Sequence, residues 1–213
     1  MYSTNQSQWN QPGVNLKGSV STMMWASDTV LVAGGQLTVN DTAKTPLAIY
    51  DVNRQSWDSY PSSNSLPGPV EVITLGSSDG KQVWAAGRNS DGSVYIMKYD
   101  GSSWRATPQR LGFKTVIKSL QVFSLTSKHA STDLLPERQS LVITGSVDLG
   151  DFGTASAAIF DGTSFQPYAL TTNIGNSAGA VSKIFTLNQD FFKLSGKSTK
   201  ALSTYALADQ IRR

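Results

Sequence analysis

The chain has 213 residues, with 39% hydrophobic side chains, 18 basic and 15 acidic side chains, and no cysteine. This apolar content with a net charge of only +3 excludes an intrinsically disordered chain and leaves no nucleic-acid-binding footprint. The absence of cysteine excludes a disulfide scaffold, a thiolate zinc site and a catalytic thiol. No apolar run approaches the roughly 18 residues of a transmembrane helix. The first residues lack a signal-peptide pattern, so we expect neither feature within the chain.

Taken from the N-terminus, the chain is expected to form short strands that recur in a repeated unit. The most regular part of the unit is an aromatic residue that ends one strand, a short turn, and a second aromatic residue that begins the next strand. The first aromatic residues are Tyr2, Tyr50, Tyr99 and Phe160, which stand 48, 49 and 61 residues apart, and the second are Trp9, Trp57, Trp104 and Phe165. Two further expected strands precede each of the last three copies, at 20–25 and 29–35, at 70–75 and 81–87, and at 116–125 and 140–145.

Four short strands in about 49 residues is the period of a kelch-type β-propeller blade. No window shows the apolar periodicity of a helix, and a two-sheet sandwich would not require aromatic residues and glycines at constant offsets. We therefore predict an all-β fold of kelch-like β-propeller blades over residues 1–196, followed by a C-terminal tail at 197–213. The chain length corresponds to about four blades.

Both ends of the chain hold part of a unit. The chain begins at an aromatic pair, in segment 2–9, and its last expected strands, 181–187 and 191–195, have no clear aromatic pair after them. The C-terminal strands could pair with the N-terminal ones and close a four-bladed ring. Equally, the chain could be part of a larger propeller.

The repeated residues are interpreted as structural, because a ligand site rarely needs the same side chain in every blade. The aromatic residues Trp9, Trp57, Trp104, Tyr50, Tyr99 and Phe160 are expected to pack within and between blades. The competing interpretation is a row of exposed aromatic residues that stacks sugars, with Trp25 or Trp84 as candidates. Close backbone approach or a positive φ is expected where the second strand of each unit ends, at Gly35, Gly87 and Gly145. Turn formation, not acid catalysis, is expected of Asp51, Asp100 and Asp161.

Residues for catalysis or metal binding are scarce. The single histidine, His129, lies in a stretch at 127–138 that lengthens the third unit and is expected to be a projecting surface loop. Asp148 and Asp151 share a turn but lack the ligand pattern of a calcium loop. No phosphate-binding loop, dinucleotide fingerprint, nucleophile elbow or zinc-protease motif occurs. We therefore predict no catalytic, cofactor or metal site, and a protein that is not an enzyme.

The full set of motifs indicates one family rather than propellers in general. It comprises Trp9, Leu-Lys-Gly-Ser-Val at 16–20, Met-Trp-Ala at 24–26, Leu-Val-Ala-Gly-Gly at 31–35, Ala-Ile-Tyr-Asp at 48–51, and Trp57. Together these resemble the fungal cortical-marker proteins for cell polarity, which are bud-site-selection and polarised-growth landmarks. Segment 181–192 is similar to the stretch that precedes the single membrane span of that family, so the resemblance implies a juxtamembrane-like tail at 197–213. The chain departs from the family after Phe192, where the apolar span is missing.

The resemblance implies a noncatalytic, kelch-like propeller ectodomain of a large membrane glycoprotein. Such a protein would mark the plasma membrane at sites of polarised growth, together with other membrane landmark or polarity proteins, and would bind neither nucleic acid nor a cofactor. Two glycosylation sequons, at Asn5 and Asn40, fit that setting. The alternative function is a carbohydrate-binding or galactose-oxidase-like extracellular propeller, and an intracellular kelch adaptor is a weaker third.

Overall fold

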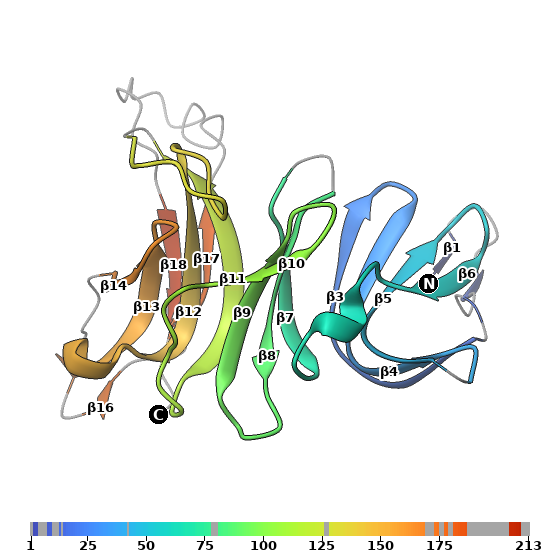
Figure 1. Cartoon of the computed structure of the whole chain (residues 1–213), viewed down its shortest axis with the longest axis horizontal. Helices are drawn as coiled ribbons and strands as arrows, with labels where there is room; N and C mark the ends of the chain where they lie inside the picture. The colour runs from blue at the N-terminus through green and yellow to red at the C-terminus, as the bar shows by residue number, and fades with distance from the viewer. Residues whose placement is uncertain are drawn as a thin grey trace.

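The computed structural model describes residues 2–3, 8–9, 13, 15–41, 43–77, 81–125, 128–168, 173–174, 177–178, 181–186 and 205–209. Three four-stranded antiparallel sheets account for most of them, and in each sheet the strands pair in chain order (Figure 1). We name these sheets blades I, II and III. The all-β fold class and the four-strand unit are confirmed.

The blades share one layout with strands of similar placement. Blade I contains β3 (Leu16–Ser27), β4 (Val30–Val39), β5 (Ala43–Asp51) and β6 (Ser56–Ser59). Blade II contains β7 (Val70–Leu75), β8 (Val83–Arg88), β9 (Val94–Tyr99) and β10 (Trp104–Ala106). Blade III contains β11 (Val116–Ser124), β12 (Gln139–Asp148), β13 (Thr154–Phe160) and β14 (Phe165–Pro167). Two single-turn 3-10 helices, η1 (Ser63–Ser65) and η2 (Gly150–Phe152), lie in connections.

Three strand pairs lie outside the full blades. They are β1 (Tyr2–Ser3) with β2 (Gln8–Trp9), β15 (Asn173–Ile174) with β16 (Ser177–Ala178), and β17 (Val181–Thr186) with β18 (Tyr205–Asp209). The strand expected at 181–187 is therefore present as β17, whereas the one expected at 191–195 lies outside the described residues. β18 lies within the segment expected to be a tail.

The first two strands of every blade pair in the same register. A one-residue bulge interrupts each pairing at the same place, at residue 21 of β3, residue 71 of β7 and residue 118 of β11. The residue before the bulge is opposite a glycine in all three blades: Val20 with Gly35, Val70 with Gly87, and Ile117 with Gly145. Because side chains alternate between faces, equal register places equivalent residues on equivalent faces.

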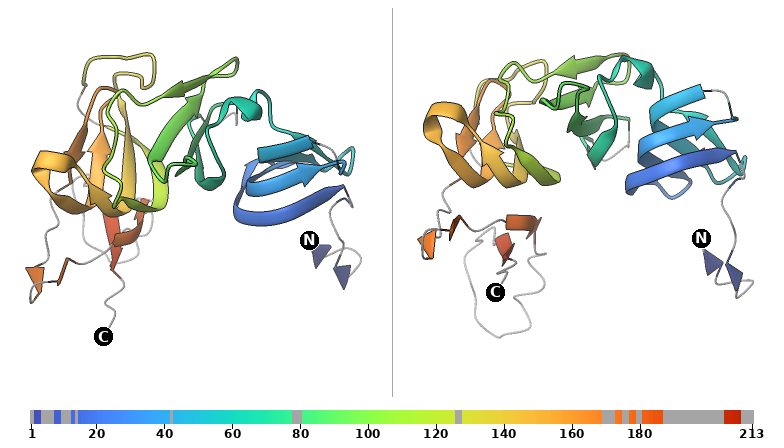
Figure 2. Two further views of the ribbon diagram at one scale, coloured as in Figure 1. Left: turned by 60° about the horizontal axis from the view of Figure 1, so that its bottom comes forward. Right: turned by 90° about the horizontal axis from the view of Figure 1, so that it is seen from below.

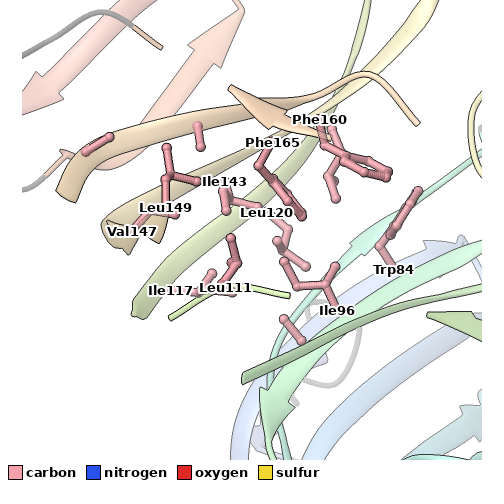
Figure 3. Close-up of a cluster of buried hydrophobic side chains, with 14 of the residues drawn as sticks. Trp84, Ile96, Leu111, Ile117, Leu120, Ile143, Val147, Leu149, Phe160 and Phe165 are labelled. Carbon is pink, nitrogen blue, oxygen red and sulfur yellow. The ribbon is translucent and has the colours of Figure 1, made fainter. Parts of the chain in front are cut away.

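The core lies between the blades. One apolar cluster fills the boundary between blades I and II, with Val32, Tyr60, Val83 and Tyr99 among its members. A larger cluster fills the boundary between blades II and III, where Trp84 meets Phe160 edge-on at 6.3 Å between ring centroids (Figure 3). Blade II is therefore buried on both faces. A smaller cluster joins blade III to Val181 and Ile184 of β17.

The three blades follow one another along an arc, as Figure 2 shows most clearly in its right-hand view. The strand pairs β1–β2 and β17–β18 lie on the same side of this arc, near its two ends. Among the described strands, β1 pairs only with β2, and β17 only with β18. The described strands thus form three complete blades, two half-blades (β1–β2 and β17–β18) and the short pair β15–β16.

Candidate partner-binding surface

The repeated aromatic residues lie in pairs on the face of each blade that is turned toward the preceding blade. Tyr99 and Trp104 of blade II pack around Tyr60 from the segment that follows blade I, with ring centroids 5.4 Å and 6.0 Å from that of Tyr60. Phe160 and Phe165 of blade III are 4.7 Å apart and belong to the cluster shared with blade II. Tyr50 and Trp57 stack at 5.1 Å on blade I. The structure describes no side chain for Trp9. Most of these rings are buried, so little of their surface is left to contact a ligand.

The repeated glycines lie where two backbones nearly touch. A Cβ on Gly35 would lie 2.0 Å from the carbonyl oxygen of Ser19, and one on Gly87 would lie equally close to that of Pro69. Gly145 meets the Val116 carbonyl in the same way and also has a φ of +140°, in the region that favours glycine. The three glycines therefore permit the bulged pairing of the two inner strands.

The repeated aspartates organise turns. The Arg54 guanidinium donates a hydrogen bond to the Asp51 carboxylate, which also accepts the backbone N–H groups of Arg54 and Asn53, and these bonds lower the Asp51 pKa. The backbone and side-chain donors of the Ser102-Ser103 turn, with the Arg105 guanidinium, hold the Asp100 pKa well below its usual range. Each carboxylate is occupied by its own turn, so none is poised as an acid or base.

Asp161 repeats this arrangement in blade III. Burial raises its pKa, but backbone N–H bonds from Ser164 and Thr163 outweigh that effect and leave the pKa lowered.

The insertion in the third unit differs from the expected projecting loop. It connects β11 and β12, as its position predicts, but Leu134 and Leu135 are buried in the cluster between blades II and III. Thr132 Oγ1 accepts the backbone N–H groups of both leucines at 3.3 Å and 3.0 Å. The rest of the described insertion, 128–133 and 136–138, is exposed or half-buried as expected, so the expectation was wrong only for the two leucines. Their apolar side chains are stabilised by burial in the blade boundary beside them.

Two side chains of blade II hold the insertion in place. Lys98 Nζ donates a hydrogen bond to the Leu134 carbonyl at 2.8 Å, and the Arg105 guanidinium pairs with Asp133 at 2.9 Å. Lys98 is almost fully buried, and burial lowers its pKa. The insertion therefore acts as a clamp across the boundary between blades II and III.

The sparse candidates for metal or acid–base chemistry do not come together. His129 lies between backbone carbonyls, and its hydrogen bonds to those of Gln139 and Ala130 raise its pKa. Asp148 accepts the backbone N–H of Gly150, and Asp151 lies in η2. In the part of the chain that the structure describes, no group of three or more His, Asp or Glu side chains could hold a metal ion.

A groove runs along the boundary between blades I and II, where β4 and β8 end. One part, of about 550 Å³, lies between the end of β4, the start of β5 and the linker between the two blades. A second part, of about 640 Å³, continues past the linker to β3 and the end of β8. Both parts share Gln36, Pro67, Gly68 and Pro69, and polar side chains line them: Lys44, Asn64, Glu71, Arg88 and Asn89.

The groove has a rigid wall. The Tyr95 hydroxyl shares its single proton between the linker carbonyls of Gly68 and Pro69, whose oxygens lie 2.8 Å and 3.0 Å away, and burial raises the Tyr95 pKa. The Arg88 guanidinium donates to the carbonyl of Thr115, at the start of blade III, at 2.5 Å. An open groove with fixed backbone carbonyls and both signs of charge can accept a polar, extended segment of another chain.

The two candidates for sugar stacking have different surroundings. Trp84 is fully buried, so its assignment as an exposed aromatic residue was wrong, because its face of β8 packs against blade III. Trp25, on β3, is 46% exposed. One exposed indole does not form the row of aromatic residues on which the sugar-binding interpretation depends.

One glycosylation candidate lies on the described surface. Asn40 is exposed in the turn after β4, with a φ of +53°, and its Oδ1 accepts a hydrogen bond from Asn15 Nδ2 at 2.8 Å. Asn15 also bonds the backbone of Trp57, so the turn is anchored to β6. Asn5 lies outside the described residues.

No helix within the described ranges is long and apolar enough to cross a membrane.

A family model for the Rax2 C-terminal beta propeller domain matches residues 1–197. The chain is 36% identical over 212 residues to Polarized growth protein L1 of Phoma sp. (strain ATCC 20986 / MF5453), which covers 97% of this chain and 16% of that protein. It is 26% identical over 183 residues to Polarized growth protein RAX2 of Candida albicans (strain SC5314 / ATCC MYA-2876), covering 81% of this chain and 13% of that protein. The chain thus spans no more than about one-sixth of either relative. No solved structure matches it.

Proposed function

The chain belongs to the family of Rax2 C-terminal β-propeller domains, and from that premise we propose that it serves polarised growth in fungi as a noncatalytic protein-interaction propeller. The observation that carries the proposal is the family match, which spans residues 1–197. Both relatives are named as polarized growth proteins, which supports the same role for this chain. In this proposal the protein is a landmark that selects the site of budding or hyphal extension.

A binding role, and not a catalytic one, is supported by how the polar residues are used. The three repeated aspartates accept backbone N–H groups of their own turns. The buried Lys98 is bound to the insertion. These groups stabilise the blades, and the chemistry left on the surface is that of recognition.

The groove between blades I and II is the proposed contact surface for other membrane landmark or polarity proteins. Lys44 and Glu71 give it both signs of charge, and the bonds from Tyr95 hold its linker wall in place. A preformed wall lowers the ordering cost of binding, and charges at the rim of an interface steer the partner and select it.

The proposal is tested by charge reversal in the full-length protein, expressed with a fluorescent tag from its own gene. Lys44→Glu changes an exposed side chain of the groove, and Lys114→Glu is the matched control on an exposed loop before blade III. We expect the tagged protein to concentrate at growth sites. Lys44→Glu should misdirect growth and weaken co-purification of polarity proteins, whereas Lys114→Glu should do neither.

Two results would contradict the proposal. A tagged protein that stays diffuse in the cytosol throughout growth would remove the landmark role. Equal behaviour of Lys44→Glu and Lys114→Glu, with normal amounts of protein, would remove the groove as the contact surface.

A location on the outer side of the plasma membrane belongs to the same proposal. The exposed, anchored turn at Asn40 is well suited to carry a glycan, because its side chain is exposed while its backbone N–H donates to the Asn15 carbonyl at 2.9 Å. Endoglycosidase treatment of the native protein should lower its apparent mass, and the shift should be smaller in an Asn40→Gln variant. An unchanged shift in that variant would show that Asn40 carries no glycan.

A further inference from the structure

One face of blade I carries large apolar side chains in water. Val20, Met23 and Trp25, all on β3, are 43%, 60% and 46% exposed. They lie on the same face as the Tyr50–Trp57 pair, because Trp25 is opposite Leu31, which is in turn opposite Tyr50, and Tyr50 is opposite Trp57. We call these three residues the β3 trio.

The residues equivalent to the β3 trio in the other blades are covered. By register, its counterparts are Val70, Ile73 and Leu75 in blade II, and Ile117, Leu120 and Val122 in blade III. Val70 and Ile73 are buried against blade I, and Ile117 and Leu120 are buried against blade II. In each case the cover is the preceding blade. The β3 trio is therefore built as a contact surface for a four-stranded sheet.

The two half-blades together supply such a sheet. β17 has the register of a first strand, because it is bulged at residue 182, with Val181 and Ile184 at the positions of Val70 and Ile73. Both residues already pack on blade III, so β17–β18 forms the inner half of a blade that follows blade III. β1–β2 has the register of an outer half, because Tyr2 is opposite Trp9 as Tyr50 is opposite Trp57.

We propose that the β3 trio is the seat of a fourth blade assembled from both ends of one chain, with β17 and β18 as its inner strands and β1 and β2 as its outer strands. The contact closes the arc into a four-bladed ring, which is within the usual range of propellers. Figure 2 shows both half-blades on the open side of the arc. Closure buries the β3 trio and pairs the free edges of β1 and β18, which would otherwise invite association with other chains.

The boundary between blades I and II supplies the geometry for a test. A Cβ at position 34 would lie 3.0 Å from the Cβ of Val70. This is close to the Cβ–Cβ distance of a disulfide, which is about 3.5–4.5 Å. In the proposed closure, residue 208 of β18 has the register position of Gly34, and Val20 of blade I has the register position of Val70. Because the chain has no cysteine, a Val20→Cys, Ala208→Cys double variant reports this contact alone.

In the 213-residue chain under mild oxidation, we expect Val20→Cys, Ala208→Cys to form a disulfide within the monomer. Ser27→Cys with Ala208→Cys, which is off register, should remain reduced. A disulfide between two chains would overturn the proposal in favour of a second copy as the cover. An absence of any disulfide, with the chain folded, would overturn it in favour of a sheet from elsewhere.

Oxidation of Met23 provides a measurement that needs no cysteine. Closure should lower its exposure toward that of Ile73, which is 7% exposed, and so slow its reaction with peroxide. Val20→Asp places a charge in the closed boundary and should speed Met23 oxidation several-fold, while Ser19→Asp, on the next and also exposed residue, should not. Equal oxidation rates in the wild type and both variants would show that the β3 trio is uncovered, and would overturn the proposal.

Discussion

Truncation of Leu135 tests whether the insertion is part of the core. Its side chain is fully buried in the cluster that holds Trp84, Leu141 and Phe165. Removing a buried leucine side chain costs about 2–5 kcal/mol, made up of lost transfer energy and the cavity left behind. A leucine in a projecting loop would cost less than about 0.5 kcal/mol. The two interpretations of the insertion therefore differ several-fold in the free energy of unfolding.

The assay is urea unfolding followed by tryptophan fluorescence, to which the neighbouring Trp84 contributes. With a denaturant slope of about 1–3 kcal/mol per molar urea, Leu135→Ala should lower the midpoint by at least about 0.7 M. The matched control is Lys128→Ala in the same insertion, which removes only an exposed ion pair with Glu137 and should change stability by about 0–1 kcal/mol. If both variants unfolded at the same midpoint, the insertion would be a surface loop and the clamp would be refuted.

Three further predictions concern the repeated residues. Gly87→Ala should prevent normal pairing of β7 with β8 and lower the melting temperature strongly, because its Cβ would lie 2.0 Å from a carbonyl oxygen; an unchanged melting temperature would refute the close approach. Trp57→Ala should cost about 3–5 kcal/mol in the same urea assay, and a loss under about 1 kcal/mol would remove its packing role. Asp100 has a folded-state pKa below its unfolded value of about 3.8, so its contribution to stability is present above about pH 4 and is lost as the pH falls through the folded-state value. The stability difference between wild type and Asp100→Asn should therefore shrink below about pH 4, and a constant difference from about pH 7 to pH 2 would contradict this.

Local patterns were sufficient to predict the blades. Each strand is short and ends at a turn residue or glycine, and the aromatic pair recurs at nearly constant spacing, so the signal depends on neighbours in sequence. The turn role of Asp100 is of this kind, because its partners are the next few residues of the chain. The family resemblance rested on the same local motifs, and residues 1–197 match the family model.

Contacts between distant segments were the source of the errors. Trp84 was a candidate exposed aromatic residue in the sugar-binding alternative, yet β8 is apolar at consecutive positions, which is the pattern of a strand buried on both faces. That signal was present in the sequence and was missed. The burial of Leu134 had a weaker signal, because a pair of leucines in a polar insertion indicates an anchor but not where the anchor binds. The groove had no signal in the sequence, because its walls come from segments that meet only when blades I and II pack together.

The sequence by itself determined the strand unit, its turns and the glycines that each unit needs, because these depend on backbone geometry within a few residues. Only the tertiary structure decided which faces are covered. In it, both faces of blade II are buried, Leu134 and Leu135 of the insertion lie in a blade boundary, and the β3 trio is exposed to water. The physical reason is that a strand has two faces, and its own residues specify that one is apolar without specifying which distant sheet will cover it.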